Sequence, residues 1–206
     1  MSVPGPEALR LFTAIDLPPE SKAQLVELLQ RLQKGMQFTG AHPTWVTSEN
    51  LHITLAFLGN QNPDQVPIIE NAMRAATGVT RPFELRLSGL ELFPTPREPR
   101  VISVAIKGEV ERLNNVYVAL TDGLRSSGFQ IDKRPFRAHL TVARIKSVKG
   151  LAGLRSVVNS HANYIGTQFI AQATTLYKST LTPAGSIYEP LCSIPLSETE
   201  PSVPNQ

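Results

Sequence analysis

Apolar residues occur at every second position in several short segments of the chain, which is the pattern of a strand with one buried face. In the segment 50–59, one face carries four apolar residues and the other face carries His52 and Thr54. Alternating or continuous apolar patterns predict strands at 9–15, 50–59, 83–93, 101–108, 137–145, 167–181 and 186–196.

Helical spacing of apolar residues alternates with these strands along the chain. The segment 18–35 places four leucines on one helical face, begins with prolines and ends at a glycine, which are common helix boundaries. Similar stripes predict helices at 62–78 and 109–127, whereas 150–162 is ambiguous between a loop and a short helix. The order and the short strands indicate an α+β fold, with helices packed outside antiparallel sheets.

The composition fits a soluble folded protein of the cytoplasm. The chain has 206 residues, of which 41% are hydrophobic, and this length allows one large domain or two small lobes. A single cysteine excludes an intrachain disulfide, and neither a signal peptide nor a membrane span is predicted. The termini, 1–8 and 197–206, are expected to be flexible. The net charge of +3 suits an anionic partner but is too small to indicate a long nucleic-acid track.

Two copies of one short motif answer why an apolar strand carries a histidine and a threonine. Residues 52–56 read HITLA and residues 139–143 read HLTVA, each on a predicted strand. A single copy would be a weak motif, whereas two copies indicate two structurally related halves. If a pseudo-two-fold axis relates the halves, the two His/Thr pairs can face each other across a cleft.

Such a pair of histidines suits the displacement of an oxygen at a phosphodiester. One imidazole can accept the proton of the attacking oxygen while the other donates a proton to the leaving oxygen. The hydroxyls of Thr54 and Thr141 can donate hydrogen bonds to phosphate oxygens, where negative charge accumulates. Neither step requires a metal, and we expect no metal and no cofactor, because no carboxylate or thiol accompanies the histidines at metal-ligand spacing.

The sequence resembles the 2H phosphoesterase superfamily, which is defined by two His-x-Thr motifs. The likeness is greatest to the branch named RNA 2′,3′-cyclic phosphodiesterase or 2′-5′ RNA ligase, and it covers residues 10 to 194. It is carried by four segments in order: RLFTAIDLP, NLHITLAFLG, RPFRAHLTVAR and LYKSTLTPAGSIYEPL. The resemblance implies a bilobed domain over 9–196, with halves near 9–98 and 99–196 and a cleft between two antiparallel sheets.

The resemblance also implies an activity and roles for single residues. The activity is hydrolysis of a terminal 2′,3′-cyclic phosphate on RNA to a 2′-phosphomonoester. His52 corresponds to the proton donor and His139 to the proton acceptor, while Arg144 matches a position that contacts phosphate. Phe57 is the equivalent position in the first copy. Strict alternation places Phe57 and Arg144 on the faces opposite their histidines, so a bulge or a strand end near each is required to bring them into the cleft.

Basic residues before the second motif form a candidate rim for RNA. Lys133 and Arg137 are expected to bind substrate, because they lead directly into the strand of His139. We expect the partners to be RNA ends or nucleotide 2′,3′-cyclic phosphates, with no membrane contact, and a monomeric protein.

Two other functions remain compatible with the same residues. One is 2′-5′ ligation of RNA halves. The other is a nucleotide- or RNA-binding module without catalysis, although the intact His/Thr pairs disfavour it.

Overall fold

The computed structural model describes residues 7–38, 43–147, 151–183 and 185–197. Its main strands form two antiparallel sheets. The four-stranded sheet has the order β11-β10-β1-β4 and comprises β11 (Gly185–Pro195), β10 (Ala173–Thr182), β1 (Leu9–Asp16) and β4 (His52–Gln61). The five-stranded sheet has the order β3-β7-β6-β5-β9 and comprises β3 (Thr44–Trp45), β7 (His139–Arg144), β6 (Val101–Gly108), β5 (Phe83–Phe93) and β9 (Ile165–Ala171). A small pair joins β2 (Gln37–Phe38) to β8 (Leu151–Ala152).

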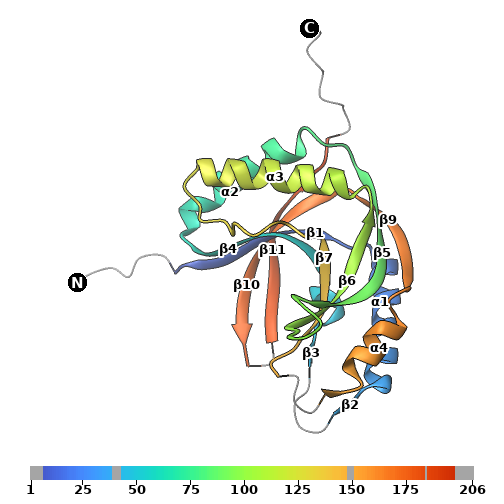
Figure 1. The fold of residues 1–206 in the computed structure, drawn as a ribbon. Coiled ribbons are helices and arrows are strands. Elements are labelled where there is room, and N and C mark those ends of the chain that lie inside the picture. Colours follow the sequence, from blue (N-terminus) through green and yellow to red (C-terminus); the bar gives the residue numbers. More distant parts are fainter. Residues whose placement is uncertain (1–6, 39–42, 148–150, 184, 198–206) are drawn as a thin grey trace, which may run out of the picture.

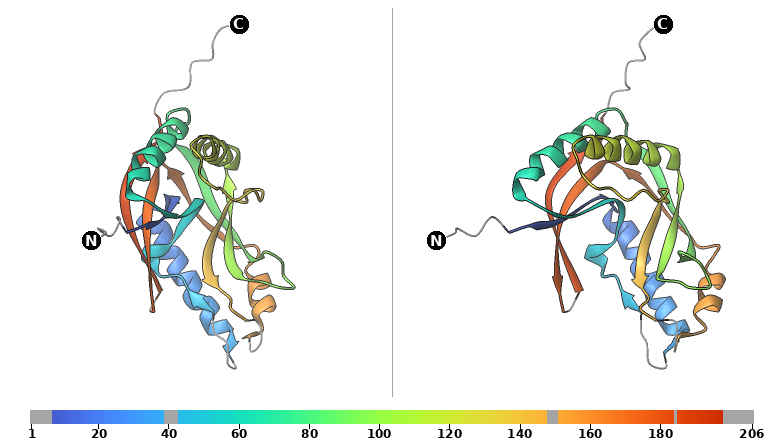
Figure 2. Two further views of the ribbon diagram at one scale, coloured as in Figure 1. Left: turned by 90° about the vertical axis from the view of Figure 1, so that its left-hand side faces the viewer. Right: turned by 60° about the vertical axis from the view of Figure 1, so that its left-hand side comes forward.

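The helices lie in two groups at opposite ends of the molecule (Figure 1). Helices α2 (Val66–Thr77) and α3 (Val110–Ser126) pack side by side over one end, and α1 (Pro19–Gly35) and α4 (Leu154–Ser160) lie at the other end. Figure 2 shows the two sheets inclined to each other below α2 and α3. The leucines at helical spacing in α1 are all buried, as the sequence pattern requires: Leu25, Leu28, Leu29 and Leu32.

Most of the predicted elements are present, and the α+β class is confirmed. The ambiguous segment 150–162 contains the short helix α4. The predicted single strand over 167–181 is wrong. The chain there forms β9 and β10, separated by Gln172, and these strands pair with β5 and β1 in different sheets. No glycine or proline marks the break at Gln172, so the pattern could not show it.

Each sheet takes strands from both parts of the chain. Strand β5, from the first part, pairs with β6, and β10, from the second part, pairs with β1. The division into halves at 98/99 therefore does not coincide with the division into sheets, and it stays a prediction about related sequence. The predicted flexible termini lie almost wholly outside the described residues.

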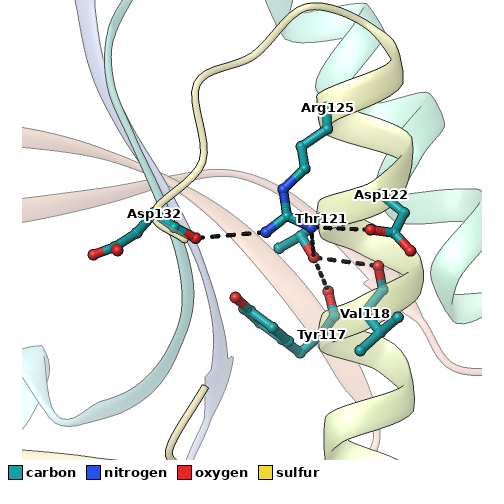
Figure 3. Close-up of polar contacts among 6 residues, drawn as sticks. All are labelled: Tyr117, Val118, Thr121, Asp122, Arg125 and Asp132. Atoms are coloured by element: carbon teal, nitrogen blue, oxygen red, sulfur yellow. Dashed lines mark hydrogen bonds and ion pairs between the residues drawn. The ribbon is translucent and has the colours of Figure 1, made fainter. Parts of the chain in front are cut away.

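The segment between α3 and β7 is tied to the last turns of α3 (Figure 3). The Arg125 guanidinium donates to the Asp122 carboxylate at 2.9 Å and to the backbone carbonyl of Asp132 at 3.5 Å. On the same helix, the Thr121 hydroxyl donates to the Tyr117 carbonyl at 2.9 Å, and the Tyr117 ring stacks on Phe136 at 4.3 Å between centroids. These contacts fix the approach of the chain to His139.

Candidate active site

Both His-x-Thr motifs contain a β-bulge at the same position. In β4, Thr54 pairs with Ala14 and Ala56 pairs with Thr13, which leaves Leu55 as the extra residue. In β7, Thr141 pairs with Ser103 and Ala143 pairs with Ile102, which leaves Val142 as the extra residue. Because one extra residue reverses the alternation of side chains, these bulges place Phe57 and Arg144 on the faces of their histidines.

The bulges bring Phe57 and Arg144 to the position that the sequence interpretation required. Both line a cavity of about 330 Å³ whose wall also includes Phe12 and Tyr188. Phe57 is 60% exposed, although it is a large apolar residue in the middle of β4. Since Arg144 comes from the five-stranded sheet and Phe57 from the four-stranded sheet, this cavity lies where the two sheets meet.

The imidazole of His52 is fixed at both of its nitrogens. Nδ1 lies 2.8 Å from the backbone carbonyl of Asn50, and Nε2 lies 3.0 Å from the Thr54 hydroxyl. A carbonyl oxygen only accepts, so Nδ1 carries a hydrogen and Nε2 is the nitrogen that can exchange a proton. The Phe12 ring stacks on the imidazole at 4.9 Å, and the Tyr188 ring meets it edge-on at 5.4 Å.

Burial dominates the acidity of His52. It lowers the pKa to about 4, while the hydrogen bond to the Asn50 carbonyl and the charge of Asp16 act in the opposite direction. The positive charges of Lys22 and Arg144 lower the pKa further. The imidazole of the ligand-free protein is therefore neutral at pH 7.

A carboxylate with two hydroxyl donors lies beside His52. Asp16 is the direct cross-strand partner of His52, so both side chains share one face of the sheet. Its oxygens accept hydrogen bonds from the hydroxyls of Tyr177 at 2.6 Å and Thr175 at 2.7 Å. Burial raises the pKa of Tyr177, so its hydroxyl stays a donor. These two bonds hold a negative charge next to the histidine.

His139 has the same kind of support from different neighbours. Nδ1 lies 2.8 Å from the Arg137 carbonyl, which leaves Nε2 to exchange a proton. The Phe93 ring stacks on the imidazole at 5.3 Å, and the Arg137 guanidinium lies 5.8 Å from the centre of the same ring. Arg137 also forms an ion pair with Glu91. Its main chain and side chain thus support His139 from two directions.

A buried hydroxyl lies beside the second threonine. Ser103 is the cross-strand partner of both Thr141 and Glu91, on the face that carries His139. It is fully buried, and its hydroxyl has no hydrogen-bond partner among the described residues. The face that carries His139 and Thr141 therefore has one further donor.

Several of these residues could not be identified from the sequence. Phe12, Asp16 and Phe93 lie outside the two His-x-Thr motifs, and only the register and the ring contacts show that they contact or face the histidines. The available signal for Phe12 and Asp16 is that both fall in RLFTAIDLP, a segment of the family resemblance, although Asp16 lies one residue beyond the predicted strand 9–15. Lys133 is exposed in the coil before β7 and does not line the cavity that contains Phe57 and Arg144.

No group of three or more potential metal ligands occurs among the residues that the structure describes. Within the same residues, no helix is long and apolar enough to cross a membrane.

Comparisons with known proteins find similar sequences along most of the chain. The family described as LigT like Phosphoesterase matches the chain twice, at residues 15–103 and 104–188. An RNA 2′,3′-cyclic phosphodiesterase of Archaeoglobus fulgidus is 33% identical over 186 residues, which are 89% of this chain and 98% of that protein. A protein of the same name from Methanocaldococcus jannaschii is 30% identical over 182 residues, covering 88% and 97%.

Solved structures show the same fold. The crystal structure of TT0787 of Thermus thermophilus aligns with a TM-score of 0.72 and 26% identity, over 93% of this chain and 100% of that one. The structure of E. coli LigT complexed with 3′-AMP aligns with a TM-score of 0.73 and 24% identity, over the same shares.

Proposed function

The chain belongs to the LigT-like phosphoesterase family, and we propose that it is a metal-independent RNA 2′,3′-cyclic phosphodiesterase. The product is a 2′-phosphomonoester with a free 3′-hydroxyl. The observation that carries the proposal is the pair of histidines, each with Nδ1 bound to a backbone carbonyl and with Nε2 available for proton transfer. The names of the relatives support the same substrate class.

The reaction assigns one proton transfer to each histidine. Nε2 of His139 accepts a proton from water as the water oxygen attacks phosphorus. The bond from phosphorus to the 3′ oxygen breaks, and Nε2 of His52 donates a proton to that oxygen. The hydroxyls of Thr54 and Thr141 and the guanidinium of Arg144 stabilise the charge on the remaining phosphate oxygens.

The surroundings of the two histidines support this assignment of roles. The Asp16 carboxylate favours the imidazolium of His52, which a proton donor needs. The cross-strand partner of His139 is Ala105, so the place that Asp16 takes beside His52 holds no carboxylate beside His139. A bound phosphate anion would raise the pKa of His52 from about 4, because it places a negative charge beside a buried imidazole.

The cavity beside His52 suits the terminal nucleoside. The 3′ oxygen that receives the proton belongs to this nucleoside, so its ribose lies on the side of His52. The exposed ring of Phe57 offers a face for base stacking, and Ser179 and Ser186 line the same cavity with polar groups.

We also propose that the protein acts as a monomer in the cytoplasm on RNA ends or nucleotide 2′,3′-cyclic phosphates. The single cysteine, Cys192, is compatible with a reducing compartment. Light scattering on the purified protein measures the oligomeric state, and a stable dimer would contradict the proposal that the protein is a monomer.

The test is hydrolysis of a short RNA with a 2′,3′-cyclic phosphate end, in EDTA, with the position of the product phosphate determined. We expect a 2′-phosphate product, and a loss of rate of about 10²- to 10⁴-fold in His52→Ala and in His139→Ala. His161→Ala is the matched control, because His161 lies at the end of α4 and bonds to Val157. Activity lost in EDTA and restored by added metal would contradict the mechanism.

A further inference from the structure

A second cavity begins directly beside His139. It is a groove of about 590 Å³ between the start of α3, strand β6 and the segment that precedes β7. Ala138, which precedes His139 in the chain, lines it, and so does Ala105, the cross-strand partner of His139. The groove is therefore continuous with the catalytic face of the five-stranded sheet and separate from the cavity beside His52.

The groove offers the groups that bind a nucleotide. Asn114 and Asn115 line it from α3 and are both exposed, so their amides are free to donate to and accept from a base edge. Phe136 provides an apolar wall, whose ring is fixed by the stack on Tyr117. Lys107 adds an exposed cation from the end of β6. The volume lies within the range of ~300–1,000 Å³ that small-ligand sites occupy.

Arg137 marks the boundary between the groove and His139. Its carbonyl holds the imidazole, while its side chain lines the groove and is 53% exposed. The ion pair with Glu91 is solvent-exposed, and pairs of that kind are easily exchanged for another anion. A phosphate that links a nucleotide in the active site to one in the groove would pass this guanidinium.

We propose that this groove binds the nucleotide on the 5′ side of the cyclic-phosphate nucleotide. The inference rests on the proposed function and narrows its substrate class to oligoribonucleotides in preference to mononucleotides. Because the groove lies directly beside His139, its occupant is the nucleotide next to the cyclic one, so the gain in specificity comes with the second nucleotide and not with a third.

The test compares kcat/KM for a mononucleotide 2′,3′-cyclic phosphate with that for dinucleotides and trinucleotides that end in the same cyclic nucleotide. We expect kcat/KM to rise about tenfold or more from the mononucleotide to the dinucleotide, which is the gain expected from the binding of one more base. The trinucleotide should give little further increase. Equal values for the mononucleotide and the dinucleotide would overturn the proposal.

Substitutions in the groove test whether its residues cause the preference for the dinucleotide. Asn114→Ala and Lys107→Ala should each lower kcat/KM for the dinucleotide several-fold and leave the mononucleotide unchanged. Arg112→Ala is the control, because Arg112 is on α3, pairs with Glu109 and does not line the groove. A dinucleotide advantage that survives in both groove variants would overturn the proposal. Failure to hydrolyse any cyclic phosphate would instead refute the proposed function.

Discussion

At the scale of single residues, the two histidines have the same kinds of contact but different charged neighbours. Each Nδ1 is bound by the carbonyl two residues earlier, and each ring is stacked on a phenylalanine of a neighbouring part of its own sheet. Asp16 lies beside His52, whereas Arg137 lies over the phenylalanine next to His139. A nearly symmetric motif thus has asymmetric surroundings, which is what separate donor and acceptor roles require.

The lowered pKa of His52 predicts that an anion binds together with a proton. Burial holds this pKa at about 4 in the free protein, so a bound anion that raises it makes the imidazole take up a proton at pH values above about 4. Calorimetry of sulfate binding in buffers of different ionisation enthalpy measures this uptake. We expect tighter binding as pH falls, and an uptake that persists in His139→Gln and disappears in His52→Gln. An uptake unchanged in His52→Gln would contradict the assignment.

The same shift predicts how stability depends on pH. The folded pKa of about 4 lies below the ordinary value of 6.5, so the folded state binds fewer protons than the unfolded state between these values. The contribution of His52 to the free energy of unfolding is complete above about pH 6.5 and is lost as pH falls through about 4. As pH falls over this range, the temperature of thermal unfolding should therefore decrease less for His52→Gln than for the wild type. An identical decline would show that the pKa is not lowered.

The ring of Phe93 is predicted to position His139 without contacting substrate. Phe93→Leu removes the surface on which the imidazole and the Arg137 guanidinium both rest. We expect kcat to fall about tenfold or more with KM little changed, because small displacements of a catalytic group are costly. Phe169→Leu is the control, because Phe169 is a buried phenylalanine in β9, at the far edge of the same sheet, and it should leave hydrolysis unchanged. A change in KM alone would indicate that Phe93 binds substrate.

At the scale of elements, bulges rather than whole strands determine which side chains reach the site. The alternation of 50–59 correctly predicts the face that His52 and Thr54 share, but it misplaces Phe57 until Leu55 is recognised as an extra residue. The sequence indicates that a bulge is needed but does not show which residue forms it, because Leu55 and Val142 are ordinary strand residues. Register against the neighbouring strand decides the position.

A third bulge, in β5, predicts a stability effect at Gly89. This residue has φ +68°, and a Cβ there would lie 2.5 Å from the carbonyl oxygen of Ala162. Gly89→Ala should lower the free energy of unfolding by ~2 kcal/mol or more, because it combines backbone strain with a clash against main chain. Gly128→Ala, at φ +89° with open space around it, should cost only the ~1 kcal/mol of the strained backbone. Equal losses in chemical denaturation would contradict this account of β5.

At the scale of the whole molecule, the sequence predicts the class of fold and the candidate His/Thr pairs but not the way the chain is divided between sheets. Local periodicity identifies helices such as α1, and the repeated motif identifies His52 and His139, because both signals lie within a few residues. The crossing from β9 to β10 depends on their pairing with β5 and β1, which are distant in the sequence. The contributions of Phe12, Asp16 and Phe93 to the site were missed for the same reason.

The pH dependence of kcat tests the central claim, that one histidine acts as base and the other as acid, most directly. Wild type should give a bell-shaped profile, because the base must be neutral and the acid must be protonated. The residual activity of His139→Ala should lose the acidic limb, and that of His52→Ala should lose the basic limb. A wild-type profile that is flat from about pH 5 to about 9 with chemistry rate-limiting, or both limbs intact in either variant, would contradict the two-histidine mechanism.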